Sequence, residues 1–361
     1  MFNRRWLRLF AVLLGLALFA AACGDDDDTD AGSDAGTADE GAADDGGDGG
    51  SGEGLRVGLV YDIGGRGDQS FNDAAYAGLT QAQEELGVEI QDLEPSAGGE
   101  DREELLRTLA EDDYDMIIGV GFAFAEAMGA VTADFPETTF AIVDDASVEA
   151  ENLTSLVFAE EQGSFLVGAA AALTSQTGKL GFIGGVEVDL IKKFEAGFVA
   201  GATQANPDAT VDVKYISQPP DFSGFNDPAK GKEIALGQYG GGADVIYHAA
   251  GGSGGGLFEA ALETGDVWAI GVDSDQYLTA GAEVQGKILT SMLKRVDVAV
   301  FEAIKSFVDG DLEPGARVFD LSNDGVGFST SGDFLSEDII SQLEDLKQQI
   351  VDGDIEVPTA P

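Results

Sequence analysis

Cysteine, histidine and basic side chains are scarce in this sequence, and each shortage excludes a class of structure or function. Its 361 residues contain one cysteine, one histidine, and 19 lysines and arginines against 67 aspartates and glutamates. A single cysteine cannot form an internal disulfide. With one histidine, a zinc site would have to rely on carboxylate ligands. We therefore expect no metal and no cofactor.

The single histidine also argues against a hydrolase. Any Ser-His-Asp triad would have to include His248. The surrounding segment IYHAAGGSGGG lacks the G-x-S-x-G turn that carries a nucleophilic serine. A glycosidase that uses two carboxylates stays open, because spacing in sequence does not measure the separation of two acids in space. The sequence nevertheless favours binding over catalysis.

The shortage of basic residues bears on the partners. Twelve acids and three arginines precede residue 55, so the remainder carries a net charge of −39. This charge excludes nucleic acid as a natural partner, because it repels phosphates. It also keeps a domain soluble, and a saline habitat is one hypothesis for it.

The N-terminal segment has the order of a secretory signal peptide. Arg4, Arg5 and Arg8 precede an apolar run from Leu9 to about Ala22, which is short for a membrane span. We expect residues 1–22 to be this signal peptide.

Cys23 follows Ala20, Ala21 and Ala22. Small residues before a cysteine at the end of such a run resemble a bacterial lipobox, although Ala20 stands where Leu, Val or Ile is commoner. In a lipobox the thiol receives a diacylglycerol and the cysteine becomes the new N-terminus. We expect lipidation of Cys23 and a membrane-anchored, extracytoplasmic protein; the alternative is plain secretion with an incidental buried cysteine.

The segment after Cys23 cannot form a core. Residues 24–54 consist of Gly, Asp, Ala, Ser, Thr and Glu, with twelve acids and no Lys or Arg. Self-repulsion and the lack of apolar surface predict that residues 23–54 form a disordered tether. The run Asp25 to Asp28 lacks the glycine-punctuated spacing of a calcium loop.

Residues 55–79, LRVGLVYDIGGRGDQSFNDAAYAGL, have the pattern of a buried strand, a glycine-rich turn and a helix with Ser70 as its N-cap. The glycines lack the G-x-G-x-x-G spacing, and no GxxxxGK[ST] motif occurs, so phosphate binding is disfavoured. Ligands of α/β sheets bind at the carboxyl ends of strands. Asp62, Ser70, Phe71 and Asn72 are therefore candidate site residues.

Strands and helices alternate from residue 55 onward, which predicts βαβ units and parallel sheet. In the first series, strands are expected at 55–61, 88–93, 115–119, 138–143 and 154–158, and helices at 70–86, 100–111 and 124–134. In the second series, helices are expected at 164–174, 187–204, 226–239 and 255–265, and strands at 179–184, 209–216, 244–247 and 267–271. Further pieces are a strand at 287–292, a helix at 294–308, a strand near 316–320 and a helix at 336–351.

Two parallel-sheet series in one secreted chain predict two lobes with a cleft between them. We expect lobe 1 to comprise residues 55–159 plus about 293–312, and lobe 2 to comprise residues 160–292 plus about 313–361. Polar groups follow several strands at the predicted cleft: Asp144, Gly251 to Gly256, Asp273 and Lys294. Each alone is commonly a turn or cap residue, but together they predict one binding surface.

Successive motifs resemble the basic membrane protein family, purine nucleoside-binding lipoproteins that serve ABC importers. These motifs are GLVYDIGGRGDQSFNDAAYAGL, KFEAGFVAG, FNDPAKGKEIA, GADVIYHAAGGSGGGLFEAA, AIGVDSDQ and TSMLKRVD. The resemblance implies the type I periplasmic binding protein fold, an α/β fold of two Rossmann-like lobes joined by three crossovers. It also implies delivery of a nucleoside to a permease and an ATPase that are separate chains, and we expect a monomer.

The resemblance also implies roles for individual residues. Phe71 and Phe225 would sandwich the purine, with Phe194 lining the cleft; Phe225 is preferred to Phe222 because it lies within FNDPAKG. Asn72 and Asp144 would read the base edge, Asp273 would accept from the ribose hydroxyls, and Lys294 would donate to ribose oxygens or pair with an aspartate. Gly251 and Gly252 would offer backbone near the sugar. The alternative on the same fold is a receptor for a free sugar or an autoinducer-like molecule.

Overall fold

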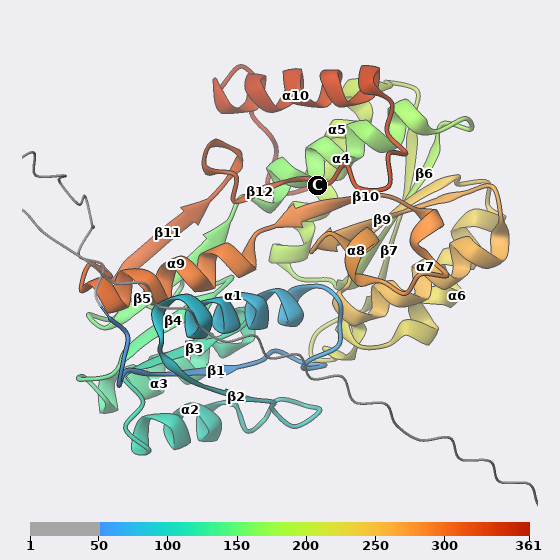
Figure 1. Cartoon of the computed structure of the whole chain (residues 1–361). Coiled ribbons are helices and arrows are strands. Elements are labelled where there is room, and N and C mark those ends of the chain that lie inside the picture. The colour runs from blue at the N-terminus through green and yellow to red at the C-terminus, as the bar shows by residue number, and fades with distance from the viewer. Residues whose placement is uncertain (1–50) are drawn as a thin grey trace, which may run out of the picture. The chain divides into compact units, whose positions relative to one another are not determined.

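The computed structural model describes residues 51–361. The predicted signal peptide, Cys23 and the acidic segment as far as residue 50 lie outside the described residues. Two six-stranded sheets belong to one compact unit of the chain (Figure 1).

The first sheet has the strand order β11-β5-β4-β3-β1-β2 and is parallel throughout. Its strands are β1 (Arg56–Val60), β2 (Glu89–Leu93), β3 (Met116–Gly119), β4 (Thr139–Val143), β5 (Leu153–Phe158) and β11 (Gly315–Phe319). Its helices are α1 (Phe71–Leu86), α2 (Arg102–Glu111), the short η1 (Phe122–Phe124) and α3 (Ala125–Asp134). We call this sheet with its helices the first half.

The second sheet has the order β12-β10-β9-β8-β6-β7, in which only β12 is antiparallel to its neighbour. Its strands are β6 (Lys179–Val186), β7 (Thr210–Ser217), β8 (Val245–Ala249), β9 (Trp268–Asp273), β10 (Ile288–Lys294) and β12 (Val326–Phe328). Its helices are α4 (Glu160–Thr174), α5 (Asp189–Ala205), η2 (Ser223–Phe225), α6 (Pro228–Gly240), η3 (Gly251–Ser253), α7 (Gly254–Thr264), α8 (Gln276–Thr279) and η4 (Gln285–Lys287). We call this sheet with its helices the second half.

Burial explains why these segments are strands. The central strands β3, β8 and β1 are buried along almost their whole length, as expected for parallel strands covered by helices on both faces. The edge strand β7 alternates between exposed and half-buried side chains. The predicted parallel α/β architecture is therefore confirmed by the pairing of the strands.

The described chain passes between the sheets three times: after β5, between β10 and β11, and between β11 and β12. On the second passage, α9 (Val296–Asp309) packs along α1 of the first half (Figure 1). On the third, η5 (Leu321–Asn323) leads to β12, and α10 (Glu337–Val351) then packs on α4.

The predicted boundary at about residue 313 needs correction. The sequence places all residues beyond it in lobe 2, but β11 pairs in parallel with β5 of the first sheet, from Gly315 opposite Thr154 to Phe319 opposite Phe158. The segment GARVF has five residues, which is too short for its pattern to reveal which sheet edge it joins. The sequence also missed β12, which has only three residues.

Candidate functional site

A cavity lies where the carboxyl ends of strands from both sheets meet, as the crevice rule for α/β sheets predicts. The space between its walls amounts to about 560 Å³, which includes volume open to solvent. The residues lining it are Asp62, Ile63, Asp68, Phe71, Asn72, Gly121, Phe122, Asp144, Leu190, Ile191, Phe194, Phe225, Ala249, Ala250, Gly251, Val272, Asp273 and Lys294. The loops after β1, β3, β4 and β8 and the last residues of β9 and β10 thus border one space.

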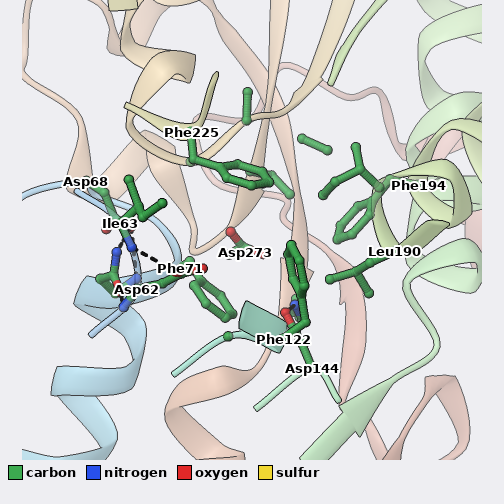
Figure 2. A pocket seen from close by; sticks show the side chains of 18 residues that line it. Asp62, Ile63, Asp68, Phe71, Phe122, Asp144, Leu190, Phe194, Phe225 and Asp273 are labelled. Atoms are coloured by element: carbon green, nitrogen blue, oxygen red, sulfur yellow. Dashed lines mark hydrogen bonds and ion pairs between the residues drawn. The ribbon is translucent and has the colours of Figure 1, made fainter. Parts of the chain in front are cut away.

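Four phenylalanine rings border this space: Phe71, Phe122, Phe194 and Phe225 (Figure 2). The Phe225 ring lies over Gly185 of β6, where a Cβ would stand 2.5 Å from the ring. A side chain at that position would therefore displace Phe225. Rings around a narrow space suit a flat ligand, because aromatic faces stack on a planar base.

The alternative ring, Phe222, has a different place. It packs against Phe122 with ring centroids 6.1 Å apart and is not among the residues that line the cavity. The structure therefore places Phe225 in the cavity wall and Phe222 against Phe122, outside the residues that line the cavity.

Lys294 is the one basic side chain among the described residues that line the cavity. Its Nζ lies 2.5 Å from Asp144 Oδ2 and 3.9 Å from Glu160 Oε1, and Glu160 Oε2 accepts from Lys193 Nζ at 3.1 Å. Burial lowers the pKa of Lys294, but the surrounding carboxylates, led by Asp144, outweigh this effect and raise it overall. Burial also raises the pKa of Glu160 to about 7. Lys294 is thus a protonated amine already paired with carboxylates.

Two carboxylates keep acceptor capacity for a ligand. Asp144 Oδ1 is buried and has no hydrogen-bond partner in the described chain. Asp273 accepts from Ser70 Oγ at 2.6 Å through Oδ2, which leaves Oδ1. Burial raises the pKa of Asp273 to about 6, although the nearby Lys294 counteracts this shift. A buried acceptor without a partner costs free energy, so a ligand that donates there would be favoured.

Asp62, Asn72 and Asp68 are linked to one another. Asn72 Oδ1 accepts from the Asp62 N–H at 2.9 Å, and Asn72 Nδ2 donates to Asp68 Oδ2 at 3.2 Å. Asp62 pairs with Arg102 at 3.2 Å and lies close to Gly121, where φ is 105° and a Cβ would stand 2.5 Å from Asp62 Oδ2. The amide of Asn72 therefore serves chiefly to join the turn after β1 to the start of α1.

Nine of the eleven predicted ligand-binding residues line the cavity: Asp62, Phe71, Asn72, Asp144, Phe194, Phe225, Gly251, Asp273 and Lys294. Ser70 and Gly252 do not line it. Ser70 is fully buried, and its hydroxyl contacts Asp273 Oδ2 and the Val272 carbonyl.

Ser70 also does not cap α1 with its side chain. Asp68 does so instead, accepting from the N–H groups of Ser70, Asn72 and Asp73.

Sequence reasoning missed Asp68, Phe122 and the pair Leu190 and Ile191. The signal for Phe122 was available, because GVGF places it directly after β3, at the same sheet edge as Asp62 and Asp144. Leu190 and Ile191 carry no comparable signal, since apolar residues in the first turn of a helix are usually core.

His248 lies outside the cavity wall. It is fully buried, burial lowers its pKa to about 4, and its Nε2 lies 3.0 Å from Gln276 Oε1. The imidazole is therefore neutral and shares a hydrogen bond with an amide, not with a serine and a carboxylate.

In residues 51–361 no group of three or more His, Cys, Asp or Glu side chains is placed to hold a metal ion. No helix in this part of the chain has the length and apolar character needed to cross a membrane.

Comparison with known proteins covers nearly the whole chain. The family model described as ABC transporter substrate-binding protein PnrA-like matches residues 55–360. A Listeria innocua protein named CD4+ T-cell-stimulating antigen is 38% identical, over 98% of this chain and 99% of that protein. A Lactococcus lactis protein named ABC transporter nucleoside-binding protein BmpA is 35% identical, over 84% of this chain and 89% of that protein.

A solved structure shows the same fold. An ABC transporter solute-binding protein from Aeropyrum pernix K1 superimposes with a TM-score of 0.74 and 29% identity, covering 84% of this chain and 93% of that one. The fold is that of the type I periplasmic binding proteins, as predicted. Because the family model spans both halves and every strand that contributes to the cavity, the chain belongs to the PnrA-like family of ABC transporter substrate-binding proteins.

Proposed function

We propose that this protein captures a purine nucleoside in the cavity and delivers it to an ABC importer whose permease and ATPase are separate chains. The observation that carries the proposal is the state of Lys294, whose Nζ is already 2.5 Å from Asp144 in a cavity bordered by aromatic rings and carboxylates. Such a cavity offers stacking surfaces and acceptors, and the charge of its one cation is already balanced by a carboxylate, so a phosphate would find no unpaired positive charge. The name of the Lactococcus lactis relative supports the same ligand class.

In this proposal Phe71 and Phe225 stack on the base, and Phe194 closes the side of the cavity. Asp144 Oδ1 accepts from a ring N–H, and Asp273 accepts from the ribose hydroxyls. Lys294 donates to a ribose oxygen, since only one of its three protons is needed for Asp144. Asp62 and Asn72 shape the turn beside the base, and the Gly251 backbone lies near the sugar.

The remaining parts of the proposal concern the whole chain. We propose that Cys23 carries the lipid, that the acidic segment tethers the body to the extracytoplasmic face of the membrane, and that the receptor works as a monomer without chemical turnover. The second candidate, a receptor for a free sugar or an autoinducer-like molecule, would use Asp273 and Lys294 and leave the rings without a planar partner.

Thermal unfolding with single ligands tests the proposal. Adenosine, guanosine or inosine at a hundred times its dissociation constant should stabilise the protein by about 2.7 kcal/mol. AMP at the same concentration should give no shift, and ribose should give none. Equal stabilisation by AMP and adenosine would contradict the nucleoside assignment, whereas equal stabilisation by ribose would favour the sugar receptor. Recovery of the added nucleoside unchanged would exclude turnover.

A further inference from the structure

Four hydrogen bonds join the two halves of the protein, and three of them link residues that do not line the cavity. They link the turn before α1, in the first half, to the end of β9 and to α8, in the second half. Thr279 Oγ1 and Gln276 Nε2 donate to the Gln69 carbonyl at 3.1 and 3.2 Å, Ser274 Oγ donates to the Ser70 carbonyl at 3.1 Å, and Ser70 Oγ donates to Asp273 Oδ2 at 2.6 Å.

The geometry of this turn is specific. Gln69 has a φ of 56°, a left-handed conformation that non-glycine residues adopt rarely and mostly where function retains it. Its carbonyl oxygen receives two donors from α8, one from Thr279 and one from Gln276. Neither these three residues nor Ser274 is part of the cavity wall.

We propose that Gln69, Ser274, Gln276 and Thr279 form a clasp that holds the two halves closed around the ligand without touching it, and that Ser70 is a positioning residue for the Asp273 carboxylate. The proposal rests on the nucleoside-binding function. Closure and ligand contact are coupled through one hydrogen bond. The bond from Ser70 Oγ to Asp273 joins the two halves, and Asp273 also lines the cavity.

The consequence for affinity follows from the populations of open and closed protein. For a ligand that is enclosed only in the closed form, the apparent dissociation constant equals the intrinsic one divided by the closed fraction. The clasp raises that fraction in the free protein. It also slows release, because the halves must separate before the ligand leaves.

Thr279 and Ser274 are the residues to change. Gln276 is unsuitable because its Oε1 also accepts from the Val272 N–H and lies 3.0 Å from Nε2 of the buried His248. Thr279 is exposed, and its hydroxyl donates to the Gln69 carbonyl, so Thr279→Val removes this bond and keeps the branched shape of the side chain. A matched control is Thr203→Val, since Thr203 is exposed on α5 and its hydroxyl bonds only within its own helix, to Val199 at 2.8 Å.

The experiment uses three forms of the full chain. They are the double variant Ser274→Ala/Thr279→Val, the Thr203→Val control and the unchanged protein. In stopped-flow displacement of guanosine, the double variant should release ligand about two- to tenfold faster per lost bond, with an unchanged association rate. Without ligand, hydrogen exchange should be faster in peptides around residues 62–72 and 224–228, which face each other across the cavity. The control should match the unchanged protein in both measurements.

Unchanged release and unchanged exchange in the double variant would overturn the clasp, and so would equal effects in the control. If the double variant did not fold, Thr279→Val alone at its exposed position would carry the test. If none of adenosine, guanosine and inosine bound the unchanged protein, the proposed function would fail, and the exchange measurement without ligand would still decide the clasp.

Discussion

Asp144 and Asp273 share an uncommon backbone conformation. Asp144 directly follows β4 with a φ of 70°, and Asp273 ends β9 with a φ of 62°. Aspartate tolerates this left-handed region better than most residues, and non-glycine residues found there often belong to functional sites. Each turn directs a carboxylate into the cavity at the point where the strand ends. The same backbone feature, in two sheets, therefore supports the assignment of both as acceptors for one ligand.

The pKa of Asp273 predicts a pH dependence of binding. Burial raises this pKa from 3.8 to about 6, with Lys294 opposing and Asp144 adding to the shift. Because ligand hydroxyls require the ionised carboxylate, affinity should fall as the pH drops below 6, by up to about tenfold per pH unit. Calorimetric titration of a nucleoside between about pH 5 and about pH 7.5 measures this.

For the stability of the ligand-free protein, the pH dependence that Asp273 contributes has the opposite sign to that of the affinity. A carboxyl group with a raised pKa binds more protons in the folded state, so its contribution to the free energy of unfolding decreases as the pH rises from 3.8 to about 6.

Asp273→Asn is the control for the binding experiment, because it keeps the shape of the side chain but cannot ionise. It should bind about ten- to a hundredfold more weakly than the unchanged protein at neutral pH, and the gap should close toward about pH 5. Parallel pH profiles would show that Asp273 does not contact the ligand.

Phe225 and Phe222 provide a matched pair at the residue scale. Phe225 lines the cavity, whereas Phe222 packs against Phe122 and does not line it. Phe225→Ala should therefore weaken nucleoside binding by about 1–3 kcal/mol, the cost of losing one stacked ring. Phe222→Ala should leave the affinity within a few fold of the original. Calorimetry on both variants decides which ring stacks, and a larger loss at Phe222 would reverse the assignment.

At the scale of elements, the contact between α4 and α5 positions part of the cavity wall. The two helices touch through backbone: a Cβ at Gly201 of α5 would lie 1.9 Å from the Phe165 carbonyl oxygen, and one at Gly168 of α4 would lie 2.2 Å from that of Phe198. Because α5 also carries Phe194, Leu190 and Ile191, the separation of these helices sets where that wall stands.

Gly201→Ala should destabilise the fold, because a methyl group cannot fit against backbone and the helices must move apart. Overpacking of this kind costs typically about 1–3 kcal/mol, which urea unfolding measures. Gly237→Ala on α6 is the control: Gly237 is exposed, nothing lies within 4 Å of its Cβ position, and alanine should stabilise the helix by about 0.5–1 kcal/mol. Equal effects of the two changes would contradict the role of the tight contact.

The elements that could be predicted from sequence are those with a strong apolar pattern. The strand expected at 138–143 is β4, Thr139–Val143, and the helix expected at 336–351 is α10, Glu337–Val351. β12 could not be predicted, because it has three residues and pairs only through Met292, Leu293 and Lys294 of a distant strand. Short edge strands acquire their structure from the sheet they join, so local pattern says little about them.

The site shows the same division between local pattern and tertiary context. Strand ends could be read from sequence, and they gave Asp144, Asp273 and Lys294. The sequence could not show that Asp68, and not Ser70, caps α1. The Ser70 hydroxyl donates to Asp273, which lies 203 positions away in the chain. A capping residue can be predicted from its neighbours only when no distant partner competes for its side chain.

At the scale of the whole molecule, three of the few basic residues stand beside buried carboxylates. Arg102 pairs with Asp62, Lys294 with Asp144, and Lys193 with Glu160. In a body with a net charge of −39, these pairs neutralise three buried acids, whereas the buried Asp273 accepts from the Ser70 hydroxyl. A charged pair is needed there because an isolated buried carboxylate is costly. The surplus of acid also opposes the entry of anions, which adds a long-range reason for excluding nucleotides.

The last prediction concerns Cys23, which lies outside the described residues. The order Arg4, Arg5 and Arg8, apolar run, three alanines and cysteine predicts a diacylglycerol on Cys23 as the new N-terminus. Cys23→Ala should therefore move the protein from the membrane to the soluble fraction and abolish incorporation of labelled palmitate. A stable anchor needs more than one acyl chain, which a diacylglycerol supplies.

Deletion of residues 25–48 is the matched control for this change, since it removes eleven acids and keeps the cysteine. The shortened protein should stay with the membrane, because the proposed tether would set the reach of the body and not its attachment. Its nucleoside affinity should be unchanged, since every residue that lines the cavity follows residue 61. Membrane association of Cys23→Ala equal to that of the unchanged protein would contradict the lipid anchor, and release of the shortened protein would instead assign attachment to the acidic segment.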